Sequence, residues 1–226
     1  KKLWNMLLRK IKNIKNYFSS KEKAKKSPGN IRRDTKSGQL IENVIYEHSL
    51  RKILEIGTWN GLGSTNTVID ILEDLNEDYS FISIESDKIF FDQAKKNLKK
   101  KMNKNIQLKL GRIIEIDELP DIENINFGEV GLIPQNKEWF IQDLRRYGKV
   151  ENIYNELPSE FDLVILDGGE FSTYPEFLKL YKKTKFIALD DTETYKQYDV
   201  LKFIKNNSGF KLVSETSGFA IYKVSD

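Results

Sequence analysis

With 226 residues, 39% of them hydrophobic and 31% charged, the chain can bury one good core, so we expect one globular domain with appendages rather than a disordered protein. The absence of cysteine excludes disulfides and thiolate metal sites, and a single histidine, His48, excludes a multi-histidine metal site. The net charge of +3 is uneven, because residues 1–26 carry a net +9 and the remaining 200 carry −6, so no general nucleic-acid-binding surface is expected.

The first 34 residues are predicted to be a basic appendage. Residues 3–18 have the spacing of an amphipathic helix, with lysines opposite an apolar stripe of Leu3, Leu7, Ile11, Ile14 and Phe18. Residues 19–34 have the composition of a linker. The helix suits either an anionic membrane surface or a protein contact, with a partner subunit in a homo-oligomer or with its own domain, and both alternatives stay open.

Lysine and arginine interrupt the apolar residues of this helix, and no apolar run in the sequence reaches the length of a membrane span. We therefore expect no cleavable signal peptide. The predicted location is the cytoplasm, with the inner face of the membrane as the alternative.

Residues 52–64 are the most informative stretch. The apolar run Ile53–Ile56 predicts a strand buried on both faces, Gly57, Gly61 and Gly63 end it, and a helical pattern follows. A strand, a glycine-rich turn and a helix in this order let backbone N–H groups approach a nucleotide-like ligand. Glu55 places a carboxylate at the end of the strand, which suits a cationic ligand and would repel a pyrophosphate.

The second predicted strand, 81–84, leads into Glu85, Ser86 and Asp87. An acidic side chain at the end of the second strand is the usual device for binding both hydroxyls of a ribose, and Glu85 is the better placed of the two acids. Asp87 is expected to cap the helix that follows.

A third strand over 106–110 is followed by residues 113–160, which are more than one crossover helix requires. Lys137 to Tyr147 has the pattern of a helix. Extra length at this edge of a sheet is where substrate pockets are built, so 113–160 is predicted to be a substrate-side insertion. Arg145 and Arg146 would suit an anionic substrate, although solvated arginines are the more frequent interpretation.

Two further strands, 161–166 and 185–189, are each followed by a helix, and 210–214 with 219–224 form a closing antiparallel hairpin. The chain from 35 to 226 is therefore predicted to be an α/β domain of five strand–helix units and a hairpin.

Four carboxylates, Asp167, Glu170, Asp190 and Asp191, follow the fourth and fifth strands. The ends of neighbouring parallel strands converge on the ligand crevice, where these groups would repel one another unless a cation or shared protons compensate. A hard divalent cation such as Mg²⁺ is the simplest answer. The alternative is that Glu170 and one of Asp190 and Asp191 cap helices.

The stretch from Glu55 to Gly63, E-x-G-x-x-x-G-x-G, resembles the first motif of class I S-adenosylmethionine-dependent methyltransferases, and the order of elements over 35–226 is similar to theirs. The resemblance implies a Rossmann-like seven-stranded sheet, mostly parallel with a C-terminal antiparallel hairpin, and S-adenosylmethionine as cofactor. In that family the glycines let the methionine part of the cofactor lie against the loop, and the acid serves its ammonium group directly or through water. The cofactor contacts implied are Glu55, Gly57, Thr58, Gly61, Gly63, Glu85, Ser86, Gly111, Arg112 and Asp167.

The motifs Asp167-Gly-Gly-Glu170 and Asp190-Asp191-Thr look similar to those of catechol-type and macrolide-sugar O-methyltransferases and of the cephalosporin-hydroxylase-related branch. That resemblance implies Mg²⁺ held by Asp167, Asp190 and Asp191. Glu170 stands where the branch has histidine, so the base stays open among Asp167, Glu170 and Asp191. The implied reaction is O-methylation of a small polar acceptor, such as a sugar or sugar nucleotide in bacterial surface-glycan or natural-product biosynthesis.

Two other functions remain as alternatives. A NAD(P)-dependent short-chain dehydrogenase has the same glycine spacing, and Tyr198 with Lys202 gives its Tyr-x-x-x-Lys pair. Against it stand Glu55, the lack of Asn-Ala-Gly after the fourth strand, and the closing hairpin. The second alternative is a non-catalytic domain that the basic helix docks to a membrane or an enzyme complex.

Overall fold

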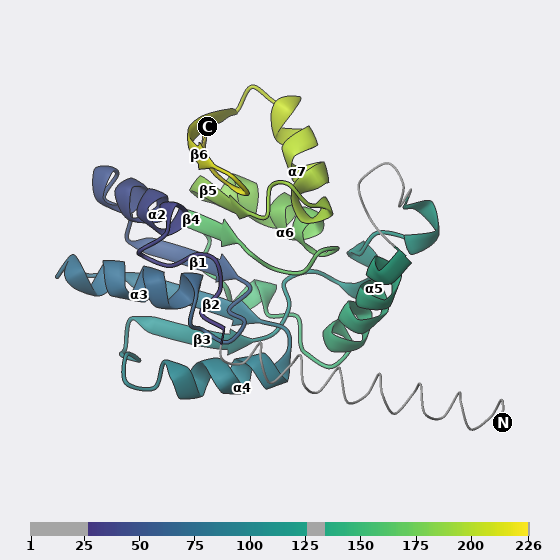
Figure 1. Ribbon diagram of the computed structural model, residues 1–226, viewed down its shortest axis with the longest axis horizontal. Coiled ribbons are helices and arrows are strands. Elements are labelled where there is room, and N and C mark those ends of the chain that lie inside the picture. Colours follow the sequence, from purple (N-terminus) through teal and green to yellow (C-terminus); the bar gives the residue numbers. More distant parts are fainter. Residues whose placement is uncertain (1–26, 126–133, 226) are drawn as a thin grey trace.

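The structure, a computed structural model, describes residues 27–125 and 134–225, so the helix predicted over 3–18 and most of its linker lie outside the described residues. The described residues form a seven-stranded sheet in the order β3-β2-β1-β4-β5-β7-β6 (Figure 1). The parallel strands are β1 (Lys52–Ile56), β2 (Ser80–Glu85), β3 (Ile106–Leu110), β4 (Phe161–Leu166) and β5 (Thr184–Asp190). The antiparallel hairpin consists of β6 (Phe210–Thr216) and β7 (Phe219–Val224), with β7 beside β5. The predicted fold class is confirmed.

The register of the central strands brings their carboxyl ends level. Ile56, the last residue of β1, pairs with Ile84 of β2 and with Leu166 of β4. Leu166 in turn pairs with Leu189 of β5. The loops that leave β1, β2, β4 and β5 therefore emerge side by side, as they do at the ligand crevice of open parallel sheets.

Both faces of the sheet are covered, which is why the central strands are apolar at nearly every position. One face packs on α2 (Lys36–Glu47), α3 (Ser64–Asp74) and Leu98 at the end of α4 (Lys88–Asn97). The other packs on α5 (Pro134–Tyr147), α6 (Thr173–Leu180) and α7 (Tyr195–Lys205). Asp87 caps α4 as predicted, because its side chain accepts a hydrogen bond from the backbone N–H of Ile89.

The segment 113–160 contains α5 and the short 3-10 turns η1 (Ile116–Glu118), η2 (Ile122–Asn124) and η3 (Tyr154–Glu156). In Figure 1, α5 lies beyond the arrowheads of the parallel strands. Residues 126–133 of this segment, with Gly128 and Gly131, are outside the described part of the chain. The described part of the segment therefore lies on the side of the sheet to which the crevice opens.

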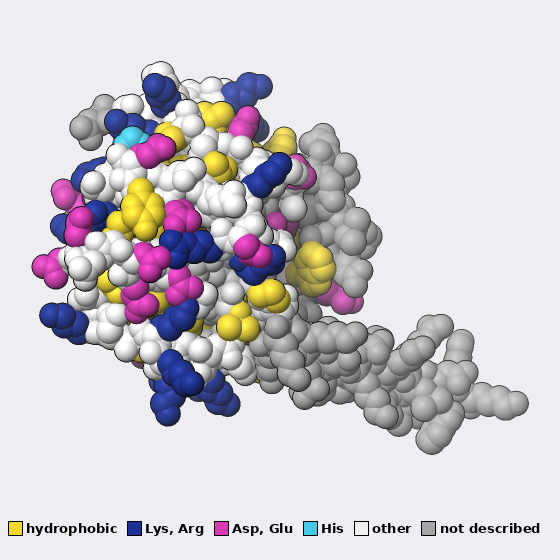
Figure 2. Space-filling view, turned by 60° about the vertical axis from the view of Figure 1, so that its left-hand side comes forward, with side chains coloured by type: hydrophobic (Ala, Val, Ile, Leu, Met, Phe, Trp, Pro, Cys, Tyr) yellow, Lys and Arg dark blue, Asp and Glu magenta, His cyan; other side chains and the backbone are white. Residues whose placement is uncertain are grey.

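The molecular surface is mixed in charge on the face seen in Figure 2, where lysine and arginine side chains alternate with acidic ones. Surface ion pairs of the described residues include that between Arg51 and Glu77, at 2.8 Å. Within residues 27–125 and 134–225, the helices are all too short or too polar to cross a bilayer.

Candidate functional site

A cavity of about 320 Å³ opens at the carboxyl ends of β1, β2 and β4. Six of the residues predicted to contact a cofactor line it together, namely Gly57, Glu85, Ser86, Gly111, Arg112 and Asp167. The turn after β1, the end of β2, the turn after β3 and the end of β4 each contribute to this wall. Segments far apart in the sequence thus meet at one crevice.

Gly57 must be glycine where the chain leaves β1. Its φ is +102°, and a Cβ added there would lie 2.1 Å from the backbone oxygen of Asp167. Its N–H donates to the carbonyl of Ile84 at 2.9 Å, which holds the turn against β2. The missing side chain therefore lets the first turn, β2 and the end of β4 lie close together at the cavity.

Gly61 and Gly63, which were also predicted to contact the cofactor, are not among the residues that line the cavity. A Cβ on Gly61 would meet Leu98 at 2.8 Å, so this glycine allows α4 to approach the loop. A Cβ on Gly63 would lie 3.2 Å from the carbonyl oxygen of Pro28. Both glycines allow other segments to pack closely against the loop on the side away from the cavity.

Glu55 is fully buried and also lies outside the cavity lining. Its side chain points to the face of β1 that carries α3, where it accepts hydrogen bonds from Thr65 at 2.6 Å and Ser83 at 2.5 Å. Thr58 joins this buried group through a 2.5 Å hydrogen bond between its hydroxyl and that of Ser83. Burial raises the pKa of Glu55 to about 7. Strand alternation directs Glu55 into the core on the α3 side, so this predicted contact lies away from the cavity.

Glu85 has the opposite placement and lines the cavity. One carboxylate oxygen accepts from the backbone N–H of Trp59 at 2.6 Å and the other from that of Asp87 at 2.7 Å. Each oxygen keeps a lone pair for a ligand hydroxyl. Burial raises the pKa of Glu85 to about 7, although these two backbone N–H groups oppose the rise.

The far wall of the cavity comes from the turn after β3. Arg112 forms an isolated parallel bridge with Asn152, so the segment before η3 lies beside it. Its guanidinium donates to the carbonyls of Tyr147 at 3.1 Å and Ile114 at 3.2 Å. These contacts hold the guanidinium against the protein. The backbone and the aliphatic part of the Arg112 side chain therefore remain to line the cavity.

Sequence analysis missed a buried pair in the cavity wall. Tyr147 donates its hydroxyl proton to Oε1 of Glu176 at 2.7 Å, while Oε2 of Glu176 has no hydrogen-bond partner among the residues that the structure describes. Glu176 is 1% exposed, and burial raises its pKa to about 7. The available signal was its position on the buried stripe of α6, in register with Thr173 and Leu180.

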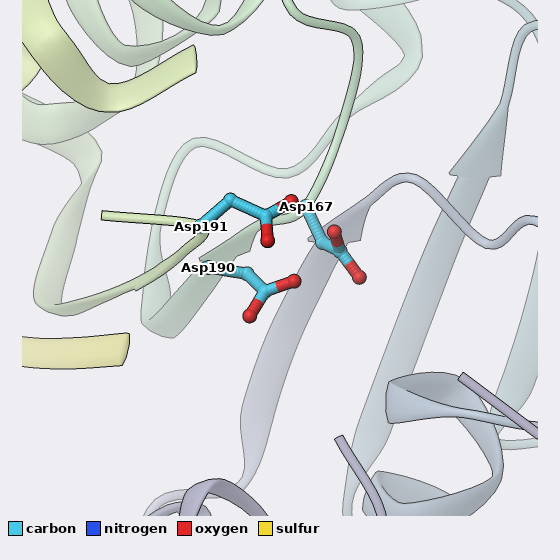
Figure 3. A group of neighbouring side chains, drawn as sticks. All are labelled: Asp167, Asp190 and Asp191. Atoms are coloured by element: carbon cyan, nitrogen blue, oxygen red, sulfur yellow. The ribbon is translucent and has the colours of Figure 1, made fainter. Parts of the chain in front are cut away.

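The predicted carboxylate cluster forms at the ends of β4 and β5. One oxygen of each of Asp167, Asp190 and Asp191 lies within 4.8 Å of the others (Figure 3). Burial, followed by the charge of Asp167, raises the pKa of Asp190 to about 8. The charge of Asp167 thus makes ionisation of Asp190 less favourable, which is the repulsion expected between neighbouring carboxylates.

A cation that sequence analysis did not identify also lies in this cluster. The ammonium of Lys196, in the first turn of α7, donates to Asp167 at 2.9 Å and to Asp191 at 2.8 Å. Burial alone would lower the pKa of Lys196, but the neighbouring carboxylates raise it above the ordinary lysine value. The sequence feature that could have indicated Lys196 is its position four residues before Val200, on the buried face of α7.

A second cavity, of about 340 Å³, adjoins the cluster. Its lining is aromatic, acidic and proline-rich, and consists of Glu118, Pro120, Glu170, Phe171, Tyr174, Pro175, Leu178, Tyr195, Lys196 and Asp199. Lys196 lines this cavity and the first one. Burial raises the pKa of Glu170, and the positive charge of Lys196 opposes the rise.

The residues of the dehydrogenase alternative lie elsewhere. Tyr198 and Lys202 are both exposed on α7, and neither lines the two cavities. Arg146, one of the two arginines considered for an anionic substrate, lines the first cavity but pairs with Asp87 and Asp143, both at 3.2 Å.

No protein-family model and no curated protein matches this chain. Among solved structures, the O-methyltransferase from Bacillus cereus in complex with S-adenosylhomocysteine matches with a TM-score of 0.54 and 15% identity, over 83% of this chain and 80% of that one. TomG, the O-methyltransferase from Streptomyces achromogenes involved in tomaymycin synthesis, in complex with S-adenosylmethionine, gives 0.53 and 16%, over 84% and 79%.

The methyltransferase PaMTH1 from Podospora anserina, with S-adenosylhomocysteine bound, gives a TM-score of 0.54 and 12% identity, over 84% of this chain and 78% of that one. At these identities the likeness concerns the fold. The chain has the α/β methyltransferase fold, with the sheet order and the closing hairpin described above.

Proposed function

We propose that this chain is an S-adenosylmethionine-dependent methyltransferase that O-methylates a small polar acceptor. The observation that carries the proposal is Glu85, a buried carboxylate at the end of β2 that is held by two backbone N–H groups and lines the first cavity. A carboxylate so fixed suits the free hydroxyl pair of a ribose. The fold shared with structures that bind this cofactor or its product supports the same assignment.

The cofactor is proposed to occupy the first cavity. The ribose binds Glu85 beside Ser86, the adenine lies toward Gly111 and Arg112, and the methionine part lies over Gly57 toward Asp167. When bound, the cofactor supplies an electrophilic methyl group on a sulfonium. The side chains at the carboxyl ends of β4 and β5 then align an acceptor oxygen with it and remove its proton.

The acceptor is proposed to bind in the second cavity. Tyr174 and Tyr195 offer ring faces, while Glu118, Glu170 and Asp199 offer oxygens that accept hydrogen bonds from hydroxyls. This combination suits a sugar or a similar polyhydroxyl compound. If the acceptor is a sugar nucleotide, the other candidate from the sequence, its diphosphate has to lie outside this lining, because the three carboxylates repel it.

Glu170 is the proposed base. It lines the second cavity and burial raises its pKa, whereas Asp167 and Asp191 each accept a hydrogen bond from the ammonium of Lys196 and do not line that cavity. Glu170 therefore accepts the acceptor's proton, while Asp167 and Asp191 hold Lys196 at the junction of the two cavities.

Magnesium at Asp167, Asp190 and Asp191, which the sequence predicted, does not fit the residues as they lie. A magnesium ion needs oxygens free to converge on it at about 2.1 Å. Two of the three carboxylates already bind the Lys196 ammonium, and a second cation at that distance would be repelled. The proposed reaction is therefore built on the chain's own side chains.

The cofactor assignment is tested by calorimetry of the full chain with S-adenosylhomocysteine. We expect binding with 1:1 stoichiometry, and a loss of roughly tenfold or more in affinity for Glu85→Gln, since about 1.4 kcal/mol of hydrogen bonding corresponds to a factor of ten. Glu73→Gln, on the exposed surface of α3, is the matched control and should bind like the wild type.

Two results would contradict this assignment. Stabilisation by NADPH but not by S-adenosylhomocysteine would favour the dehydrogenase alternative. No shift in melting temperature with either compound would favour a non-catalytic docking domain.

Residues 1–34 are proposed to dock the domain, either to an anionic membrane surface at the cytoplasmic side or to a second copy of the chain. The support is the net +9 of residues 1–26 together with the apolar stripe over 3–18. Sedimentation with vesicles that contain anionic lipid, compared with neutral vesicles, tests the first alternative. Sedimentation equilibrium without lipid tests the second.

A further inference from the structure

Lys196 is the residue of the site that the sequence resemblance does not account for. It is 5% exposed, lines both cavities, and donates to Asp167 and Asp191. A lysine is seldom buried unless it is paired, and this one is paired with two of the three carboxylates that sequence analysis assigned to a metal. Its position therefore bears directly on which cation the cluster uses.

The neighbouring residues hold this lysine in a fixed place. Gln197, the next residue, is fully buried, and its amide N–H₂ donates to the carbonyls of Leu166 at 3.1 Å and Asp190 at 2.9 Å. These bonds tie the first turn of α7 to the last residues of β4 and β5. The ammonium thus projects from a helix anchored to the sheet.

We propose that Lys196 is a built-in cation that fills the place of a divalent metal at the ends of β4 and β5, and that its ammonium holds the acceptor oxygen beside the methyl donor. The first half concerns the cluster alone, and the second rests on the proposed methyltransferase function.

The chemistry of the group supports this role. An ammonium has three N–H donors, and two of them bind Asp167 and Asp191. Among the described residues, these are the two side chains that accept from it, so one donor is left for an acceptor oxygen. Because Lys196 borders both cavities, an oxygen bound there lies between the proposed cofactor and acceptor sites. The positive charge also stabilises the alkoxide character that develops as the proton leaves.

The test is the binding of Mn²⁺ to the full chain. Binding is measured by calorimetry and by the electron paramagnetic resonance signal of the free Mn²⁺ that remains. The wild type is expected to bind no Mn²⁺ in the cluster. Lys196→Met removes the ammonium but keeps the three carboxylates, so it should gain a site at least tenfold tighter than any in the wild type. Lys202→Met, an exposed lysine on the same helix, is the control and should behave like the wild type.

Stoichiometric Mn²⁺ binding to the wild type that Asp190→Asn abolishes would overturn the proposal. So would a folded Lys196→Met that gains no site, because the lysine would then not occupy a cation position. If circular dichroism shows that Lys196→Met does not fold, the wild type and a folded Lys196→Arg decide the outcome, and both are expected to bind no Mn²⁺.

The same samples separate this proposal from the proposed function. Titration with S-adenosylhomocysteine reports on the first cavity, and Mn²⁺ reports on the cluster. A wild type that binds neither compound would reject the cofactor assignment and leave the built-in cation standing.

Discussion

At the two ends of the site, carboxylates are held by different kinds of donor. At the end of β2, Glu85 is held by the backbone N–H groups of Trp59 and Asp87, which lie within its own turn or the adjoining one. At the ends of β4 and β5, Asp167 and Asp191 are held by the Lys196 side chain, which comes from a helix that follows both strands.

This difference has a physical consequence. Backbone donors cannot be removed by substitution of a side chain, so the β1–β2 end is sensitive chiefly to changes in backbone geometry. The β4–β5 end depends on one ammonium and is sensitive to the loss of that charge. The β1–β2 end therefore depends on backbone conformation, whereas the β4–β5 end depends on the charge of one side chain.

The largest expected loss of stability comes from a substitution that disturbs the backbone at the β1–β2 end. Gly57→Ala adds a Cβ at a φ of +102° and 2.1 Å from the Asp167 carbonyl oxygen, so we expect a loss of about 5 kcal/mol from strain and overpacking together, and no S-adenosylhomocysteine binding. Urea denaturation measures the loss. Gly218→Ala has a φ of +72° with no atom within 4 Å of the added Cβ, and should cost only about 1 kcal/mol. Similar losses in both variants would mean that the close approach to Asp167 is unimportant.

The next largest loss of stability is expected when the ammonium at the β4–β5 end is removed. Lys196→Met leaves the carboxylates at the ends of β4 and β5 without their ammonium. Because the Asp167 and Asp191 side chains are 25% and 43% exposed, water replaces part of the lost interaction, and we expect a cost of about 2–3 kcal/mol, below that of breaking a fully buried pair. Chemical denaturation at pH 7 measures it, with Lys202→Met expected within about 0.5 kcal/mol of the wild type. A stabilised Lys196→Met would contradict the view that the lysine compensates the cluster.

The smallest expected effect is a change in how stability depends on pH. Burial raises the pKa of Glu176 to about 7 from an ordinary 4.5, so the folded state binds more protons than the unfolded state between these values. Stability should therefore fall as the pH rises from about 5 to 7, by roughly 1–3 kcal/mol for this residue. Glu176→Gln cannot ionise and should flatten part of the slope, as measured by melting temperatures at pH 5 and pH 8. An unchanged slope would show that Glu176 ionises normally.

The buried glutamates at the other end of the site act in the same direction. Glu55 and Glu85 also have pKa values raised to about 7 by burial, so a slope remains in Glu176→Gln. The affinity for S-adenosylhomocysteine should follow the ionisation of Glu85 and weaken as the pH falls below 7.

Local pattern alone was enough to predict the strands and the first turn. The runs at 106–110, 161–166 and 219–224 match the observed strands residue for residue, since apolar runs bounded by turn residues are local properties of the chain. Gly57 follows β1 directly and Glu85 is the last residue of β2, so their place at the crevice follows from the direction of a parallel sheet.

The side on which a residue points was harder to predict. Glu55 lies two residues before Gly57, and its alternation along β1 directs it to the α3 layer rather than to the cavity. Gly61 and Gly63 have the spacing of a ligand loop, but they accommodate α4 and Pro28.

The fold class, the order of the elements and the gathering of acids at one edge of the sheet could be predicted from the amino-acid sequence, because strand periodicity and turn chemistry act between near neighbours. Which cation meets those acids depends on long-range packing. Lys196 is 29 residues from Asp167, and it reaches that carboxylate because the crossover of α6 and β5 brings α7 back over the ends of the strands. A pairing that depends on such a crossover cannot be predicted from the spacing of residues in the sequence. The only hint there is a lysine among the buried positions of α7.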